Sequence, residues 1–256
     1  MTDETPATEP ARRQPWLTGA RAGYVALGVS AIALALAAAP YFTGGSDVRA
    51  YLMAHPEVLQ EASMALQTKD AQARVDETNK LAAANAVLLA PDARDPAFGP
   101  TDAKVTVIEF FDFRCPGCKA VAHDYRALMA AHPEVRFVFK DWPILDRGED
   151  VTSQYAARAA LAAHQQGKYL AVYDALMTEP ALTMEGVDRI LAENGVDVAR
   201  AKAFIQSGDA TRHIADIHTT AAALRLQGTP TFFVNGKASS SIDPAEISRL
   251  IEAAKR

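Results

Sequence analysis

A strand, a helix and a second strand follow one another between residues 104 and 140, and this order constrains the fold more than any other feature. The run KVTVIEFF (104–111) is rich in the β-branched and aromatic residues that strands favour, and EVRFVFK (134–140) alternates apolar with polar residues. Between them, Pro116 begins a helix that continues to about Ala131, because proline is tolerated at the first helical position. The pattern predicts an α/β domain.

A helical block, a β-hairpin and a last helix are predicted to complete this domain. Residues 151–227 form several helical pieces, with glycines as stops and aspartates as N-caps: Gly167, Gly195, Gly208, Gly228, Asp197 and Asp209. Asn235-Gly236 is typical of a type I′ hairpin turn, and Asp243 begins the last helix as its N-cap. The fold class is therefore α/β, with one domain over residues 101–256 and a helical insertion at about 151–227.

An uncharged segment, residues 22–42, is long enough to cross a bilayer, since about 20 apolar residues suffice. Three arginines precede it, so the positive-inside bias keeps residues 1–21 in the cytoplasm and exports the rest. The small residues 37–39 leave a cleaved signal peptide as an alternative, and a buried soluble helix as a third. We predict a bacterial inner-membrane anchor with the main domain in the periplasm, or a periplasmic protein after cleavage. Both place the cysteines in an oxidising compartment.

Residues 43–90 have the composition of a helix, with no glycine between Ser46 and Pro91. Apolar residues recur at roughly heptad spacing: Val48, Leu52, Leu59, Ala62 and Leu66. This spacing predicts a coiled-coil stalk that joins protomers into a homo-oligomer through residues 47–90. The alternative is a helix that lies against its own domain. Residues 91–100, with three prolines and a glycine, are predicted to be a linker.

Charge and cysteine content exclude several classes of function. The net charge is -5 and no basic cluster is present, so nucleic acid is not an expected partner. The chain has only two cysteines, and these cannot build a disulfide framework, which needs four or more. The core must therefore supply the stability, and the sulfur atoms are available for chemistry.

Cys115 and Cys118 stand directly after the first predicted strand, and Pro116 begins a helix between them. The sulfur of Cys115 is thus expected at a helix N-terminus, where unpaired N–H groups and the helix dipole stabilise a thiolate. Cys118 follows one helical turn later, within reach of a disulfide. We predict that Cys115 is exposed and attacks, and that Cys118 lies inside and resolves the intermediate.

Two other interpretations of the cysteine pair are weaker. A structural zinc site needs four ligands, and the sequence has no second Cys-x-x-Cys. His213 and His218 are five residues apart, which does not place them on one face of a helix. No metal site is predicted, and an inert pair is disfavoured by its position between a strand and a helix-opening proline.

Two motifs together, EFFDFRCPGCK and GTPTFFVNG, resemble the thioredoxin superfamily and in particular its DsbA-like branch. The helical segment before the domain is similar to that of ScsC-type membrane-tethered or stalked members. The resemblance covers residues 95–256 well and residues 47–90 weakly. It implies a thioredoxin fold with a helical insertion, preceded by a transmembrane helix and a stalk. It also implies a redox-active Cys115–Cys118 disulfide with no other cofactor.

The resemblance also implies roles for several residues. Thr229-Pro230 is expected to be a cis peptide bond beside Cys115, where the Thr229 backbone pairs with an extended substrate. Pro116 and Gly117 are expected to contact substrate as well. Glu109 corresponds to the buried acidic residue beneath the disulfide, and as a buried carboxyl it can exchange a proton with Cys118; a solvent-facing strand residue is the alternative.

Three further charged residues flank this predicted site. Lys140 is either an electrostatic partner of Glu109 or a plain surface lysine. Asp112 and Arg114 are expected to tune the field around the cysteines. The dipeptide Pro-Gly differs from the Pro-His of strongly oxidising members, which suggests a less oxidising site.

These features predict a periplasmic thiol:disulfide oxidoreductase, an isomerase or reductase, that acts on unfolded or misoxidised envelope proteins. A membrane redox partner is expected to reduce or oxidise its active site. A DsbA-like dithiol oxidase is the first alternative. An envelope protein that binds copper(I) through its two thiolates is the second, since soft thiolates suit that ion.

Overall fold

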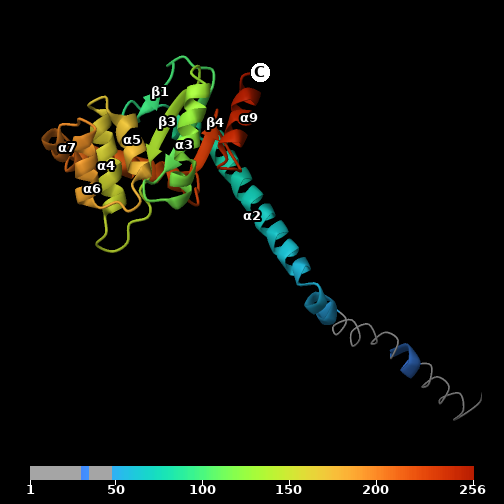
Figure 1. Ribbon diagram of the computed structural model, residues 1–256. Coiled ribbons are helices and arrows are strands. Elements are labelled where there is room, and N and C mark those ends of the chain that lie inside the picture. Colours follow the sequence, from blue (N-terminus) through green and yellow to red (C-terminus); the bar gives the residue numbers. More distant parts are fainter. Residues whose placement is uncertain (1–29, 35–47) are drawn as a thin grey trace, which may run out of the picture. The chain divides into compact units, whose positions relative to one another are not determined.

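The computed structural model describes residues 30–34 and 48–256 (Figure 1). The chain divides between Gln67 and Thr68 into two compact units. None of the described helices is both long and apolar enough to span a membrane. The segment 22–42 lies mostly outside the described residues, as do residues 1–21, so the anchor stays a prediction.

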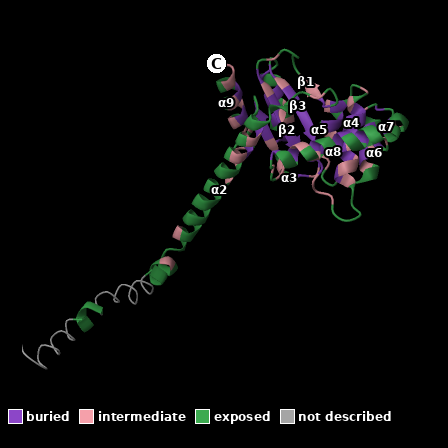
Figure 2. Cartoon of the chain, turned by 180° about the vertical axis from the view of Figure 1, so that it is seen from behind, coloured by how far each residue is buried: buried purple, intermediate pink, exposed green. Residues whose placement is uncertain are grey.

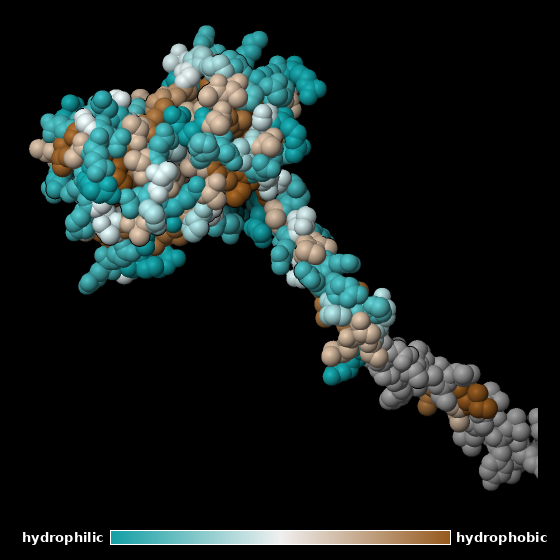
Figure 3. Space-filling model, viewed as in Figure 1, coloured by the Kyte–Doolittle hydropathy of each residue, from teal (hydrophilic) through white to brown (hydrophobic). Residues whose placement is uncertain are grey.

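The first unit is helical where it is described. Residues 48–54 form a helix, and a second helix, α2 (Pro56–Ala84), begins at the proline that the sequence offers for its first position and continues into the second unit. Within the first unit, large hydrophobic side chains are exposed to solvent: Val48, Tyr51, Met53, Leu59, Met64 and Leu66. Ile32 and Leu34, in the described segment 30–34, are also exposed. Figure 3 shows hydrophobic surface on the described segment that lies between the grey parts of the chain.

The second unit is built on a five-stranded mixed sheet in the order β1-β3-β2-β4-β5. The strands are β1 (Ala97–Phe98), β2 (Thr106–Phe111), β3 (Arg136–Asp141), β4 (Thr231–Val234) and β5 (Lys237–Ala238). The central strands β2 and β3 are parallel and are joined by α3 (Pro116–Ala131), whereas the other pairs are antiparallel. The order strand, helix, strand therefore forms as the sequence predicts.

Helices cover both faces of the sheet and make two apolar cores. On one face, alternate strand residues such as Phe111 and Phe139 pack against α3, α5 (Tyr169–Thr178) and α9 (Pro244–Ala254). On the other face, Ile108, Phe110 and Val138 pack against α8 (Gly208–Ala223) and 3₁₀ helix η1 (Ala86–Leu89). Figure 2 shows the strands between the helices largely in the colour of buried residues, and β2, β3 and β4 are buried along most of their length.

The predicted helical insertion is present and consists of successive short helices: α4 (Thr152–His164), α5, α6 (Met184–Glu193), α7 (Val198–Ile205) and α8. In Figure 1, α4, α5, α6 and α7 gather at one side of the sheet. Gly167 and Gly195 follow helices with positive φ, as expected of helix stops. Asp197 caps α7 as predicted, by accepting the backbone N–H of Arg200.

Three local predictions need correction. Ser207, not Asp209, is the N-cap of α8, and Gly208 begins this helix instead of ending one. The predicted linker 91–100 contains the edge strand β1, in which Phe98 packs on Phe139 and Tyr169. A strand of two residues between prolines is too short to show an alternating sequence pattern. Its pairing with β3 alone defines it as a strand.

The predicted stalk, residues 43–90, also differs from the structure at its C-terminal end. From Thr68 onward this segment belongs to the second unit. Thr78 is buried and donates to the Leu224 carbonyl, and Asn79 accepts the N–H of Ala238 in β5. This end of α2 therefore lies against its own domain, as the alternative interpretation expected, and covers the sheet edge at β5.

Candidate active site

Cys115 is the N-cap of α3 and Pro116 is its first helical residue, as the sequence predicts. The strand β2 ends at Phe111, and the short loop after it delivers Cys115 to the helix N-terminus. Both cysteines are free thiols. Cys115 keeps 7% of its surface exposed and Cys118 none. As expected, Cys115 is the more accessible of the two thiols and Cys118 lies inside. Cys115 is nevertheless far less exposed than predicted, because the loop at Thr229 packs against it.

The Thr229-Pro230 peptide bond is cis, and it lies beside the outer thiol as expected. The thiol of Cys115 donates to the carbonyl oxygen of Thr229 over 3.2 Å. Gly117 lies so close to Pro230 that a Cβ atom at position 117 would be 3.3 Å from Pro230 Cδ and 3.8 Å from Cys115 Sγ. The two motifs of the sequence, distant along the chain, therefore form one site.

The two thiols have opposite protonation behaviour. A hydrogen bond from the Cys118 thiol, with others from the Thr229 side chain and the N–H groups of Gly117 and Cys118, lowers the pKa of Cys115 to about 5. Burial, the hydrogen bond to Cys115 and the charge of Glu109 raise the pKa of Cys118. At neutral pH the site therefore holds a thiolate at Cys115 and a thiol at Cys118.

Glu109 lies beneath the cysteines and is completely buried, so the expected burial is confirmed. Burial raises the pKa of its carboxyl well above the ordinary range, and the charges of Asp141 and Cys115 raise it further. The phenol of Tyr173 opposes part of this increase. A buried carboxyl with a raised pKa, close to a buried thiol, can exchange a proton with it.

Lys140 is not the partner of Glu109, and this prediction is wrong. In the parallel β2–β3 pair, Glu109 stands opposite Phe139 and Lys140 opposite Phe110, so the two side chains lie on opposite faces of the sheet. Lys140 Nζ instead lies 2.5 Å from a carboxylate oxygen of Asp95, and both side chains are buried. It is not a surface lysine either.

Asp112 organises the loop before Cys115 and was assigned too small a role from the sequence. Its buried carboxylate accepts N–H groups from Arg114, Ile144 and Leu145, and the hydroxyl of Ser153 at the start of α4. These four hydrogen bonds to Asp112 hold the loop between β2 and Cys115 against the loop that follows β3. Arg114 Nη1 forms ion pairs with Asp150 at 2.7 Å and Asp146 at 3.4 Å.

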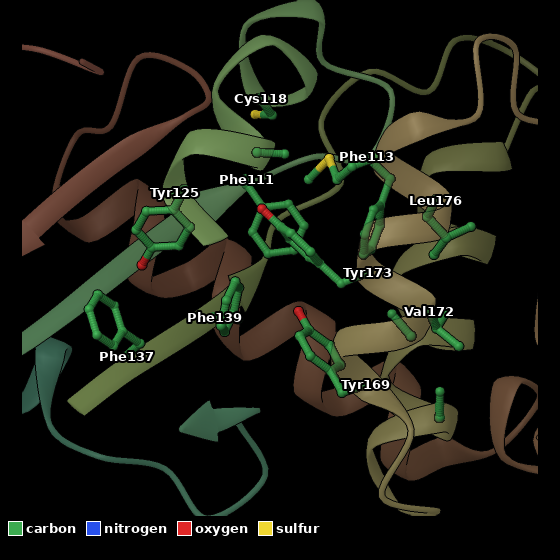
Figure 4. Packing of buried hydrophobic residues seen from close by; sticks show 14 of the residues in the cluster. Phe111, Phe113, Cys118, Tyr125, Phe137, Phe139, Tyr169, Val172, Tyr173 and Leu176 are labelled. Carbon is green, nitrogen blue, oxygen red and sulfur yellow. The ribbon is translucent and has the colours of Figure 1, made fainter. Parts of the chain in front are cut away.

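Three buried groups near Glu109 were missed: Asp141, Tyr169 and Tyr173. Tyr169 and Tyr173 come from α5, and Figure 4 shows their hydroxyl ends directed from that helix toward the strands. Asp141 ends β3 and accepts the Tyr169 hydroxyl at 3.0 Å. The alternation in β3 was the available signal for Asp141, because it extends the buried series Phe137 and Phe139 by one position.

Within the described residues, no group of three or more His, Cys, Asp and Glu side chains is arranged to hold a metal ion. The two sulfur atoms are thus the soft ligands that the described part of the chain can offer at this site.

Comparison with sequence families identifies two regions. Residues 91–253 match the family described as Thioredoxin, and residues 46–73 match the family described as Copper resistance protein ScsC N-terminal domain. The Na(+)/H(+) antiporter NhaA 3 of Salinispora tropica is 34% identical over 152 residues, which are 57% of this chain and 22% of that protein. The chain therefore spans about a fifth of the length of this curated relative.

Solved structures with similar folds include two bacterial proteins. A thioredoxin-like oxidoreductase from Silicibacter pomeroyi has 37% identity and a TM-score of 0.58, with 64% of this chain and 94% of that chain covered. BcfH of Salmonella enterica Typhimurium has 27% identity and a TM-score of 0.62, with 89% and 100% covered.

Proposed function

This chain belongs to the thioredoxin family, as a DsbA-like protein similar to ScsC, and from that membership we propose that it exchanges thiols with protein disulfides through Cys115 and Cys118. One observation carries the proposal. An outer thiol with a lowered pKa stands at a helix N-terminus, beside the Thr229 carbonyl, and an inner thiol with a raised pKa lies within hydrogen-bond reach. The opposite pKa shifts make Cys115 the nucleophile and Cys118 the thiol that resolves the intermediate.

The first step is attack on a substrate disulfide by the Cys115 thiolate. The new S–S bond joins Cys115 to one substrate sulfur, and the second substrate sulfur leaves as a thiolate with the electron pair of the broken bond. The hydrogen bonds that lower the Cys115 pKa keep the attacking sulfur ionised at neutral pH. The reverse reaction, in which a substrate thiolate attacks the Cys115–Cys118 disulfide, forms the same intermediate.

The second step resolves this mixed disulfide. Cys118 must lose its proton before it can attack Cys115, and burial makes that loss unfavourable without a base. The carboxylate form of Glu109 takes the proton, the Cys115–Cys118 bond forms, and the substrate thiolate leaves. Glu109 therefore joins the cysteines as a catalytic group in this proposal.

Substrate contacts are assigned to the surface around Cys115. The Thr229 carbonyl is an acceptor that an extended substrate segment can use once Cys115 is ionised or in a disulfide, because the thiol proton no longer occupies it. Pro116, Gly117 and Pro230 line the same place.

The expected activity is that of an isomerase or reductase on unfolded or misoxidised envelope proteins, and the exposed apolar residues of the first unit support an oligomer. A dithiol oxidase is the second candidate. The low Cys115 pKa favours it, because a stabilised thiolate stabilises the reduced state and makes the disulfide oxidising. Either activity belongs in the periplasm with a membrane redox partner.

The test is to trap the intermediate with the full chain. Cys118→Ala leaves the attacking thiol and removes the resolving one, so mixed disulfides with protein substrates should accumulate on Cys115 and disappear with reductant. Cys115→Ala is the matched control and should trap none. If Cys118→Ala forms no adduct with a protein disulfide, the proposed function is wrong. Stoichiometric copper(I) binding without thiol exchange would instead favour the copper-binding alternative.

A second experiment separates isomerase from oxidase. With Cys115 and Cys118 kept reduced by glutathione, the full chain should restore activity to a protein whose several disulfides have been scrambled. Leu59→Gln with Leu66→Gln removes two exposed apolar side chains of the first unit and should lower both the oligomeric state and this activity. Glu61→Gln, on the same helix, is the control. The oxidase is favoured if the leucine variant is a monomer and oxidises a reduced protein as fast as the unmodified chain does.

A further inference from the structure

Asp141 is a second buried carboxyl on the face of the sheet that carries Glu109. In the parallel β2–β3 register, Glu109 pairs with Phe139 and Phe111 pairs with Asp141, so the two acids are diagonal neighbours on one face. Glu109 is 0% exposed and Asp141 is 1% exposed. The function proposed above uses Glu109 and leaves Asp141 without a role.

No ion pair joins either acid to a cation within the described residues. Lys140, the nearest lysine in the sequence, binds Asp95 on the opposite face. Within the described residues, the Tyr169 hydroxyl donates to Oδ1 of Asp141 at 3.0 Å, and the Tyr173 phenol lies close enough to Glu109 to oppose part of the rise in its pKa. Oδ2 of Asp141 and both oxygens of Glu109 have no partner in the described part of the chain.

Burial without a cation prevents both acids from being ionised at once. Burial is the largest cause of the raised pKa of each carboxyl, and the charge of Asp141 also raises the pKa of Glu109. Two like charges in an apolar site are costly, so the pair retains one proton, and the charge of Asp141 favours its position on Glu109. The charge on Asp141 therefore decides how strong a base Glu109 is.

We propose that Asp141 is a positioning residue for the exchange reaction, whose negative charge makes the Glu109 carboxylate a strong base toward Cys118. This inference rests on the proposed function. When Cys118 attacks, its proton passes to the Glu109 carboxylate, its sulfur forms the bond to Cys115, and the substrate sulfur leaves with the electron pair. Asp141 gains and loses nothing in the step; its charge, through space, makes the transfer to Glu109 more favourable.

Several other ionisable groups face the pair and bear on its pH dependence. From α5, Tyr169 contacts Asp141 and Tyr173 lies near Glu109; from α3, Tyr125 lies near Glu109. The three phenols have raised pKa values because they are buried, so they do not ionise near neutral pH. Asp95, whose charge also acts on Asp141, is held by Lys140. The acids and the thiols are therefore the groups that titrate in this network.

The experiment measures the resolution step in the full chain against pH. Reduced protein is mixed with glutathione disulfide and quenched with acid, and mass spectrometry separates the mixed disulfide from the Cys115–Cys118 disulfide. Asp141→Asn keeps the shape and removes the charge, so Glu109 becomes a weaker base with a lower pKa. The pH–rate profile should move to lower pH, with faster resolution on its acid side and a lower plateau on its alkaline side.

If Asp141 had a purely structural role, Asp141→Asn would slow resolution at every pH, and that result would overturn the inference. A pH–rate profile of Asp141→Asn that superimposes on that of the unmodified protein would overturn it too. Tyr169→Phe gives a second measurement, because loss of its hydrogen bond disfavours the Asp141 carboxylate and should move the profile in the same direction. In a Glu109→Gln background, Asp141→Asn should add no further change. Absence of any resolution in the unmodified chain would reject the proposed function instead.

Discussion

The sulfur of Cys115 lies 3.2 Å from the carbonyl oxygen of Thr229, although 114 residues separate the two in the sequence. This contact joins the helix that carries the thiols to the loop that precedes β4. A protonated thiol donates to the carbonyl and occupies it, whereas a thiolate cannot donate. Ionisation of Cys115 therefore releases an acceptor for an incoming substrate strand at the same moment that it creates the nucleophile.

Alkylation should reveal the ionisation of Cys115 directly. Iodoacetamide reacts with thiolates, so its rate with the reduced full chain should follow a titration with a midpoint near pH 5. Cys118→Ala removes the hydrogen bond that lowers this pKa most, and the midpoint should move to higher pH. A midpoint at the value of an ordinary cysteine, about pH 8.5, would contradict the geometry described here.

The stability of the reduced protein should rise with pH relative to that of the oxidised protein. Cys115 has a pKa of about 5 in the folded reduced state against an ordinary value of 9.0. Between these values the unfolded chain binds one proton more than the folded chain, so the stabilisation grows with pH, is complete above pH 9 and is lost as pH falls through 5. The oxidised protein has no such thiol.

Thermal unfolding of both redox forms between pH 5 and pH 9 checks this sign. The midpoint of the reduced form minus that of the oxidised form should increase across the range. Cys115→Ala under reducing conditions serves as the control and should lose the slope. Parallel curves for the two redox forms would contradict a lowered pKa.

Gly117 should be sensitive to the addition of a single methyl group. A Cβ at this position would lie 3.3 Å from Pro230 Cδ, so Gly117→Ala should push the Thr229-Pro230 loop outward and weaken its contact with Cys115. The alkylation midpoint of Cys115 should then rise. Because alanine favours helix over glycine by about 1 kcal/mol, the unfolding midpoint should not fall, which separates this effect from general destabilisation.

Gly228→Ala is the matched control for that substitution. It lies in the same loop, but a Cβ there would have no atom within 4 Å. Its alkylation midpoint should equal that of the unmodified protein. Equal effects of the two alanines would mean that crowding against Pro230 does not govern the thiol.

Local patterns were sufficient to predict the main elements and the centre of the site. Pro116, Asn235-Gly236 and the alternation in the strands each have short-range causes, and the structure has α3, the β4–β5 turn and the central strands where these signals predict them. The motif resemblance further implied the meeting of Cys115 with Thr229, which no local signal shows.

Features that depend on strand register and on distant packing were missed. For Lys140 the sequence left two alternatives, a partner of Glu109 and a surface lysine, and the structure has neither. Side chains alternate between the faces of a sheet at each residue, and the β2–β3 register is not encoded locally. Tyr169 and Asp141 meet only because α5 packs against that face of the sheet. The residues of the site could therefore be predicted from the sequence, whereas the buried polar residues around it are brought together only by the fold.

The ion pair between Lys140 and Asp95 should be important for stability and irrelevant to the thiols. Lys140→Met leaves a buried carboxylate without its ammonium partner, which costs about 3–5 kcal/mol in free energy of unfolding. Urea unfolding of the full chain measures this loss. Lys104→Met, at an exposed position before β2, should change stability by about 0.5 kcal/mol or less.

Removal of both charges distinguishes a lost ion pair from lost packing at the same position. Asp95→Asn combined with Lys140→Met removes the carboxylate, which would otherwise keep only His213 Nε2 at 3.2 Å, and should recover most of the stability that Lys140→Met loses. Because Lys140 lies on the face of the sheet opposite Glu109, all three proteins should keep the same alkylation midpoint for Cys115. A double variant as unstable as Lys140→Met alone would show that the lysine stem, packed in the second core, contributes more than its charge.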